Sequence, residues 1–242
     1  VLDLIRNPFY LNEYLKSYIN KEELDYISFK KKLWNKNIKK SKPQREQSFL
    51  QIAFERANKG TFFVKVDTDK DILDKELVAD GILGYENSGY FITHDIYEEW
   101  ALEKIIESAF TNKPTNHAFF NNIGDSLPVR RCFRNWVSEK LYLKNESVKK
   151  FIEEVIEDEK LESIWKDEIL VSVLLSDYSK VFFEIFEKEL LINKHALLKK
   201  LAFLLKLTCK EVDYDFFTKL GINKSDFSSI KFILTKPRGK GW

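Results

Sequence analysis

Three arginines near the middle of the chain could bind an anionic group. Arg130, Arg131 and Arg134 lie at positions i, i+1 and i+4 of a segment whose apolar residues recur at helical spacing. Side chains four positions apart share one face of a helix, so two of the three arginines should point the same way. Such a guanidinium pair can hold a phosphate or a partner's carboxylate. The same face could instead pair with nearby glutamates, and the sequence leaves both interpretations open.

The motifs of the common catalytic sites are absent from this sequence. It contains no Gly-x-x-x-x-Gly-Lys-Ser/Thr phosphate loop and no hydrophobic strand that ends in paired acidic residues for Mg²⁺. A serine nucleophile elbow, a His-Glu-x-x-His zinc helix and a closely spaced Cys-His pair are also missing. The chain by itself should therefore not hydrolyse ATP.

The cysteines and a lone central histidine give no metal site. Cys132 and Cys209 stand far apart, with no His or Cys close enough to form a metal knuckle, so we expect two reduced thiols. His117 stands in a polar stretch, residues 112–125, which we expect to be a loop anchored by Phe119 and Phe120. A lone histidine in such a loop is more often a surface residue than a ligand.

The composition is that of a folded and mostly helical protein. The 242 residues are 44% hydrophobic and 14% aromatic, which is enough to form a core. Only eight Gly and five Pro occur, and long periodic runs favour helices. The formal net charge of +2 is too balanced to indicate a nucleic-acid coat or a strong attraction to a membrane.

The sequence also bears on location and completeness. No segment reaches the roughly 18 to 20 apolar residues that span a bilayer, and the first residues lack the basic start of a signal peptide. We therefore expect a cytoplasmic protein. Because the sequence contains no Met, we also expect a fragment of a longer polypeptide.

Residues 81–110 are predicted to form a β-hairpin that leads directly into a helix. Two β-prone runs, 82–85 and 90–93, flank a turn whose residues, Asn87-Ser88-Gly89, tolerate positive φ. After residue 93 the apolar residues recur at helical spacing, with glutamates on the other face. His94 should end the second strand, and Asp95 should cap the helix.

The elements before the hairpin complete the order of a winged helix. Residues 44–58 are predicted to form a helix, 61–66 a strand and 71–80 a second helix. Helix, short strand, helix, hairpin and helix is the order of that fold. Upstream, a helix should start near Pro8 with Asn7 as its cap, and Pro43 should mark a boundary.

Many winged helices bind DNA, but this sequence argues against it. A recognition helix offers basic or amide side chains to base edges. The helix before the hairpin instead has four acidic residues and one basic one, so phosphates would repel it; these are Asp71, Asp74, Glu76, Asp80 and Lys75. A lysine-rich run, residues 29–45, contains Trp34 and could contact nucleic acid. Its apolar residues keep helical spacing, which favours a solvated helix face instead.

After residue 126 the pattern is one of successive amphipathic helices. A helix with the three arginines should follow Pro128. Further helices are predicted at residues 147–158, 161–175, 178–191, 194–208 and 214–220, with short polar links. Short links between helices of similar length indicate antiparallel neighbours, as in a helical bundle or the start of an α-solenoid.

The hairpin and the helix after it resemble a known signalling domain. Phe91-Ile92-Thr93-His94-Asp95, followed by an aromatic, acidic and Trp-Ala-Leu run, looks like the winged-helix subdomain of STAND-type signalling NTPases, which include the NACHT proteins and the plant disease-resistance NLR proteins. Residues 4–11, with Asn7-Pro8, are similar to the segment that follows the last NTPase strand in NACHT-like proteins. The pattern from Pro128 to Trp136, and more weakly residues 235–242, resembles bacterial antiviral STAND proteins.

This resemblance implies a three-part organisation and a nucleotide site. Residues 1–43 would be a small helical domain, 44–111 the winged helix, and 112–242 a second helical domain leading into helical repeats. His94 would reach the β-phosphate of bound ADP, and Pro8 would pack near the adenine. The ADP or ATP, with Mg²⁺, would be shared with an NTPase domain that is not in this chain.

The resemblance also implies a function, namely the regulatory part of a nucleotide-locked switch. Its partners would be its own NTPase domain and its helical repeats. A foreign, phage-derived protein would be the trigger, and the activated protein would form a homo-oligomer in prokaryotic antiviral defence. A winged-helix nucleic-acid-binding protein and a helical protein-interaction scaffold are the alternatives.

Overall fold

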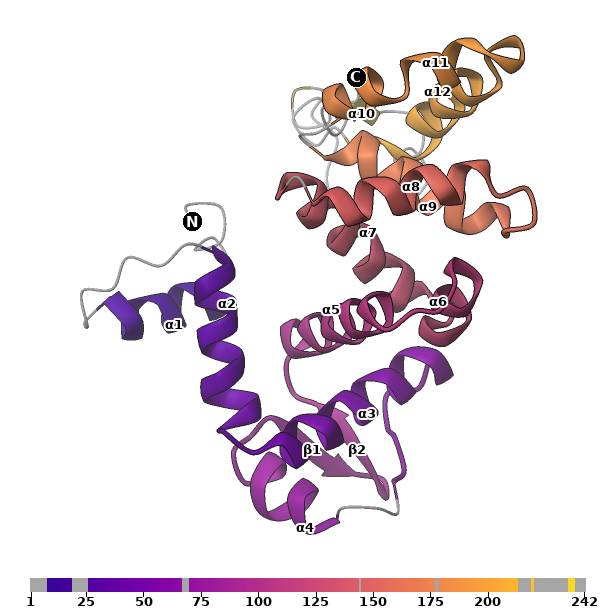
Figure 1. Ribbon diagram of the computed structural model, residues 1–242. Coiled ribbons are helices and arrows are strands. Elements are labelled where there is room, and N and C mark those ends of the chain that lie inside the picture. The colour runs from indigo at the N-terminus through magenta and orange to yellow at the C-terminus, as the bar shows by residue number, and fades with distance from the viewer. Residues whose placement is uncertain are drawn as a thin grey trace. The chain divides into compact units, whose positions relative to one another are not determined.

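The computed structural model describes residues 8–18, 26–66, 70–143, 145–176, 179–212, 219 and 235–237. In these ranges the chain is mainly helical (Figure 1), and its strands form two small antiparallel pairs. The mainly helical fold class predicted from the sequence is therefore confirmed. The chain divides into two compact units, Val1–Ile105 and Ile106–Trp242. The three-part division expected from the resemblance stays a prediction.

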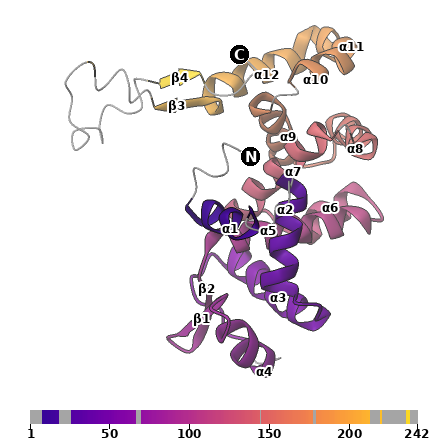
Figure 2. The same cartoon turned by 90° about the vertical axis from the view of Figure 1, so that its left-hand side faces the viewer.

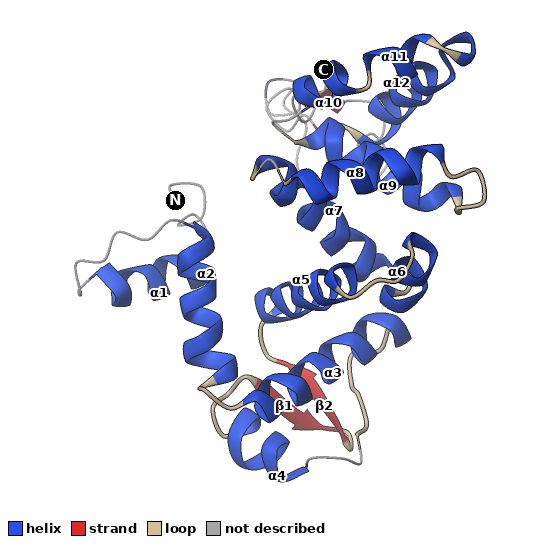
Figure 3. Cartoon of the chain, viewed as in Figure 1, coloured by secondary structure: helices blue, strands red, loops and turns tan. Residues whose placement is uncertain are grey.

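Unit 1 consists of short helices and one hairpin. Its helices are α1 (Pro8–Tyr18), α2 (Tyr26–Trp34), α3 (Pro43–Lys59), α4 (Lys70–Ile72) and the first part of α5 (Asp95–Thr111). Two of them continue as wider π-helical turns, α2 into η2 (Asn35–Lys39) and α4 into η3 (Leu73–Val78). The hairpin, red in Figure 3, comprises β1 (Leu83–Glu86) and β2 (Gly89–Ile92).

The hairpin forms where local signals predicted it. Its strands pair in antiparallel register, with Tyr85 opposite Tyr90, and the two turn residues Asn87 and Ser88 have φ values of 49° and 59°. This left-handed pair gives the turn the twist that a two-residue hairpin requires. On one face, Gly84 lies opposite Phe91, and a Cβ at position 84 would overlap the Phe91 ring.

The strand predicted over residues 61–66 is reduced to one bridge. Val64 and Tyr90 exchange two backbone hydrogen bonds of 2.8 Å, and no longer ladder forms there among the described residues. The neighbouring side chains explain this, because Phe62 and Phe63 turn onto the Phe91 ring, with ring centroids 5.4 and 5.9 Å away. The segment is therefore held by aromatic packing more than by strand pairing.

The core of unit 1 is formed where helices α2, α3 and α5 meet the hairpin. α3 packs against η2, η3 and β2. The buried side chains come from α2, η2, α3, η3, the hairpin and α5, and they include Leu33, Trp34, Ile38, Phe49, Ile52, Leu73, Leu77, Ile92, Tyr97 and Trp100. Phe9 and Tyr14 of α1 pack against this cluster from its edge. Helix α1 begins at Pro8, as predicted, whereas the expected cap Asn7 lies outside the described residues.

Unit 2 is a series of helices joined by short links, followed by a small sheet. After the end of α5 come α6 (Asn116–Ile123), α7 (Leu127–Tyr142), α8 (Glu146–Glu157), α9 (Ser163–Leu175), α10 (Ser179–Ile185), α11 (Glu187–Leu191), η4 (Asn193–His195) and α12 (Ala196–Thr208). Strand β3 (Lys210–Val212) then pairs antiparallel with β4 (Thr235–Pro237), as Figure 2 shows.

The loop predicted over residues 112–125 was wrong in part, because α6 lies within it. The Thr115 hydroxyl accepts a hydrogen bond of 3.1 Å from the Ala118 N–H, which caps the helix start, and Gly124 follows its end. The helix buries Phe119, Phe120 and Ile123. That i, i+1, i+4 apolar spacing was the sequence signal for the helix.

The C-terminal predictions need two further corrections. The helix predicted at 178–191 is split at Phe186 into α10 and α11, and the next helix starts at Ala196 rather than 194 because three residues with positive φ, Asn193 to His195, precede it. The strand pair β3–β4 was not predicted. The helix predicted at 214–220 and the final turn at Trp242 lie outside the described residues, apart from position 219.

Aromatic side chains form the core between α6, α7, α8 and α9. Phe119 and Phe120 pack on Phe133 of α7 and Phe151 of α8, with ring centroids 5.5 to 6.1 Å apart. Trp165 of α9 stacks on Phe120 at 4.6 Å. These rings are at most 3% exposed, and pairs in such geometries contribute about 0.5 to 1.5 kcal/mol beyond burial.

Candidate functional site

His94 lies at the junction between β2 and α5. The strand ends at Ile92, and the Thr93 hydroxyl donates to a backbone carbonyl oxygen at the start of the hairpin, that of Gly81 (2.7 Å) or Ile82 (2.9 Å). The His94 carbonyl then accepts a bond of 3.0 Å from the Tyr97 N–H in the first turn of α5. Hydrogen bonds on both sides of His94 therefore fix the position from which the imidazole projects.

A cluster of aromatic rings surrounds His94. The Phe9 ring of α1 is 4.4 Å from the imidazole, centroid to centroid, and the Tyr97 ring is 6.1 Å away. Phe9 also meets Tyr97 at 5.5 Å and Trp100 at 6.3 Å. The Tyr97 hydroxyl accepts a hydrogen bond of 3.1 Å from the Asn37 amide, and burial raises the pKa of this tyrosine. Residues from α1, η2 and α5 thus form one packed group with His94.

One imidazole nitrogen of His94 has no hydrogen-bond partner in the part of the chain that the structure describes. Nδ1 of His94 is buried and bonds to none of the described residues, although the residue as a whole is half-buried. A buried polar atom without a partner costs about 1 to 3 kcal/mol. Such an atom is satisfied when a water molecule or a ligand group reaches it, so this nitrogen is a candidate contact atom.

The structure brings the segment of Pro8 next to His94. Pro8 is exposed and is the first residue of α1, and Phe9, which follows it directly, is the ring that packs on His94. Pro8 and His94 are far apart in the sequence, and their segments meet through the contact between the Phe9 and His94 rings. Phe9 and Tyr97 were not named as site residues from the sequence, because only the fold shows that they surround the histidine.

Two of the three candidate arginines pair with a glutamate of unit 2. Arg130 Nη1 is 3.5 Å from Glu168 Oε1, and Arg134 Nε is 3.0 Å from Glu168 Oε2. Both distances are those of ion pairs, but the Arg134–Glu168 contact does not have the geometry of a hydrogen bond. Burial raises the pKa of the Glu168 carboxyl, and the two arginines act in the opposite direction. Arg131 is exposed. Of the two interpretations left open by the sequence, these contacts favour the pairing with a glutamate for Arg130 and Arg134.

The lysine-rich run also faces carboxylates. Lys30 pairs with Glu103, Lys36 with Glu13, Lys39 with Glu46, Lys40 with Asp80 and Lys42 with Glu76. Arg45, only 1% exposed, donates to the backbone carbonyls of Ile38 and Asn37 and lies 2.6 Å from Asp80. Lys40, Lys42 and Arg45 thereby join the segment between η2 and α3 to the acidic residues at the end of η3. The ion pairs give these basic side chains a structural role in place of a contact with nucleic acid.

The other residues considered from the sequence have local partners. His117 is exposed, and its Nε2 lies 2.9 Å from Asp158 Oδ2. Cys132 and Cys209 are both buried. Within the ranges that the structure describes, no group of three or more His, Cys, Asp and Glu side chains could hold a metal ion. In the same ranges, no helix has both the length and the apolar character needed to cross a membrane.

No protein-family model matches this sequence, and a search of curated proteins finds no match either.

Proposed function

We propose that this chain is the regulatory part of a STAND-type signalling NTPase, a nucleotide-dependent switch. The observation that carries the proposal is the packing of Phe9 on His94, a half-buried histidine whose Nδ1 has no partner among the described residues. The resemblance assigns nucleotide contacts to two positions, Pro8 and His94. That the residue next to Pro8 touches His94 supports a shared site.

The order of elements in unit 1 also supports the proposal. α3, the Val64 bridge, the α4–η3 helix, the β1–β2 hairpin and α5 follow one another as in a winged helix, and Val64 joins the hairpin through Tyr90. The successive short-linked helices of unit 2 would be the second helical domain that leads towards sensor repeats.

In the proposed switch, His94 would donate an N–H to a phosphate oxygen of ADP that is held mainly by the NTPase domain. A charge-assisted bond of this kind exists in only one of two domain arrangements, so it favours the closed state. Its loss would shift the balance between closed and open states by about 1 to 3 kcal/mol. Pro8 would pack against the adenine. Ligand sensing by later repeats would then release the winged helix and permit ATP binding and oligomerisation.

The biological setting follows from the same proposal. A cytoplasmic antiviral sensor of a prokaryote, triggered by a phage protein and active as a homo-oligomer, fits the resemblance best. Nucleotide hydrolysis would belong to the NTPase domain, because the phosphate loop and the acidic Mg²⁺ strand are absent from these 242 residues.

The test starts from the natural coding sequence. We expect a phosphate loop and an acidic-ended strand within about 150 to 250 residues before Val1, the length of one domain. The complete polypeptide should then be purified as wild type, as His94→Ala and as His117→Ala, and its retained nucleotide measured by extraction and chromatography. His117 is the matched control, because it is an exposed histidine with a carboxylate partner.

We expect His94→Ala to bind ADP about 5- to 150-fold more weakly and to be active without its trigger, whereas His117→Ala should behave as wild type. Retention of ADP by His94→Ala at the wild-type level, or an upstream sequence without a phosphate loop, would overturn the proposal. A salt-sensitive shift of duplex DNA by the chain would instead favour the nucleic-acid alternative.

A further inference from the structure

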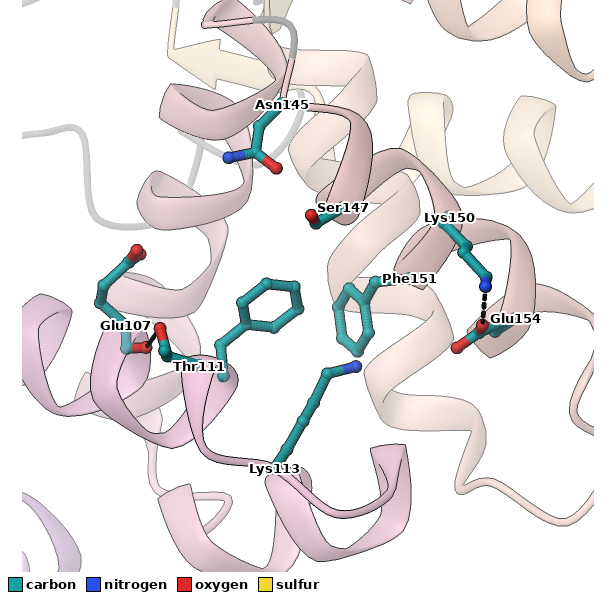
Figure 4. A pocket seen from close by; sticks show the side chains of 9 residues that line it. Glu107, Thr111, Lys113, Asn145, Ser147, Lys150, Phe151 and Glu154 are labelled. Carbon is teal, nitrogen blue, oxygen red and sulfur yellow. Dashed lines mark hydrogen bonds and ion pairs between the residues drawn. The ribbon is translucent and has the colours of Figure 1, made fainter.

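Unit 2 contains a pocket of about 530 Å³ between the end of α5, the link that follows it, and α8 (Figure 4). Phe110 and Phe151 supply its apolar surface, with ring centroids 5.3 Å apart at an angle of 81°. Asn145 and Ser147 line it at the N-terminal end of α8. The pocket is independent of the proposed function, because all of its lining residues lie in unit 2, whereas His94 and Pro8 belong to unit 1.

Lys113 is the notable charged group of this pocket. Its Nζ lies 4.7 Å from the centroid of the Phe110 ring and 4.5 Å from that of Phe151, and it donates a hydrogen bond to the Asn116 amide oxygen. No carboxylate of the described residues lies within ion-pair distance of this amine. Burial lowers the pKa of Lys113, and the charge of Glu154 acts in the opposite direction. The ammonium is thus held by rings and one neutral amide.

The two carboxylates that line the pocket already have partners. Glu107 is 2.8 Å from Lys140 Nζ and accepts a bond of 2.5 Å from the Trp136 indole N–H. Glu154 accepts a bond of 3.0 Å from the Asn116 amide and lies 3.9 Å from Lys150 Nζ. Each of these acids therefore has a basic partner of its own, whereas Lys113 has no carboxylate among the described residues within ion-pair distance and feels Glu154 only from farther away.

The chemistry of the lining defines what would fit. An anionic group would pair with Lys113 in partly desolvated surroundings, where such a bond is stronger than in water. Ser147 and the start of α8 lie on the other side of the Phe151 ring from Lys113 (Figure 4), so Lys113 is the group that would attract the negative charge. The two phenyl rings favour an apolar or aromatic group beside that charge.

We propose that this pocket binds a small organic anion, a carboxylate or phosphate monoester attached to an aromatic or other apolar group, with Lys113 as the residue that recognises the charge. Phenyl phosphate and benzoate are the two probes. Their relative affinities show whether the pocket prefers a phosphate or a carboxylate as the anionic group. Binding is measured by isothermal titration calorimetry and by chemical-shift changes in ¹H–¹⁵N spectra of the 242-residue chain.

Both anions should shift the resonances of residues around Phe110 and Ser147. Lys113→Met should weaken binding about tenfold or more, since a hydrogen bond to a charged group is lost. Lys180→Met is the matched control, because Lys180 is an exposed lysine of α10 outside the pocket, and it should bind as wild type. Circular dichroism melts verify that both variants are folded.

A second comparison uses only the wild-type chain, so it does not depend on the folding of Lys113→Met. Phenyl phosphate should bind more tightly than benzyl alcohol, which lacks the charge, and than inorganic phosphate, which lacks the ring. If benzyl alcohol or inorganic phosphate bound as tightly as phenyl phosphate, the proposal would be overturned. Unchanged affinity in a folded Lys113→Met variant, or shifts spread over lysines throughout the chain, would do so as well.

Discussion

The ring of Phe9 lies 4.4 Å from the imidazole of His94, at an interplanar angle of 48°. This contact joins helix α1 to the junction of β2 and α5, and it places a phenyl ring beside a histidine whose Nδ1 has no partner among the described residues. Phe9 therefore contributes both to the attachment of α1 and to the environment of His94.

Phe9→Ala should loosen α1 and expose His94. Because Phe9 is only partly buried, we expect a loss of about 1 to 3 kcal/mol in the free energy of unfolding, below the range for fully buried phenylalanines. Urea unfolding measures the loss, and the ¹H resonance of the His94 ring should move as the ring current of Phe9 disappears. Leu11→Ala, at a 39% exposed position of the same helix, is the control. An unmoved His94 resonance would contradict the contact.

Asp80 should make the stability of unit 1 depend on pH in the acid range. A hydrogen bond from Lys40, together with the charge of Arg45, holds the pKa of Asp80 below its usual value. A carboxyl whose pKa is lowered by folding stabilises the fold above its unfolded-state pKa of about 3.9 and loses that contribution as pH falls through the lower folded-state pKa.

Asp80→Asn should therefore lower stability at pH 7 and flatten the loss of stability between about pH 4 and pH 2. Urea midpoints measured over this range provide the comparison. Asp71→Asn is the control, because Asp71 is 86% exposed and pairs with an exposed lysine in the next helical turn. If Asp80→Asn and wild type lose stability in parallel on acidification, the contacts of Asp80 with Lys40 and Arg45 do not contribute to the pH dependence of stability.

Glu168 should hold α7 and α9 together through its two arginines. Glu168→Gln removes the negative charge that the partly buried Arg130 and Arg134 share, and we expect a loss of about 1 to 2 kcal/mol in the free energy of unfolding. The expected loss of stability is smaller than for a fully buried ion pair, because both arginines are partly exposed. Urea unfolding of the variant, with the exposed Glu184→Gln as control, measures the effect.

A Glu168→Gln variant with wild-type stability would contradict this structural role. It would also reopen the other interpretation of the arginines, in which they are kept available for a phosphate.

Features that depend on neighbouring residues in sequence were predicted well. The hairpin turn at Asn87-Ser88 and the start of α1 at Pro8 have local causes, namely residues that tolerate positive φ and a proline suited to the first helical turn. Helix α6 had a local signal too, in Thr115 and the spacing of its apolar residues, but the polar residues around it favoured a loop.

Features that depend on distant residues were not predictable from one sequence. The choice of Glu168 as the partner of Arg130 and Arg134 requires α7 and α9 to lie side by side. The contact of Phe9 with His94 and the two rings around Lys113 likewise arise only when separate segments pack. The β3–β4 pair joins segments more than 20 residues apart, and neither strand exceeds three residues.

The packing of Phe91 over Gly84 has a consequence for how this sequence can vary. A side chain at position 84 and the ring at position 91 compete for the same space, while Phe62, stacked on the ring at 5.4 Å, limits its movement. Relatives of this chain should therefore change these two positions together. A glycine at 84 should accompany an aromatic residue at 91, and a larger residue at 84 should accompany a smaller one at 91.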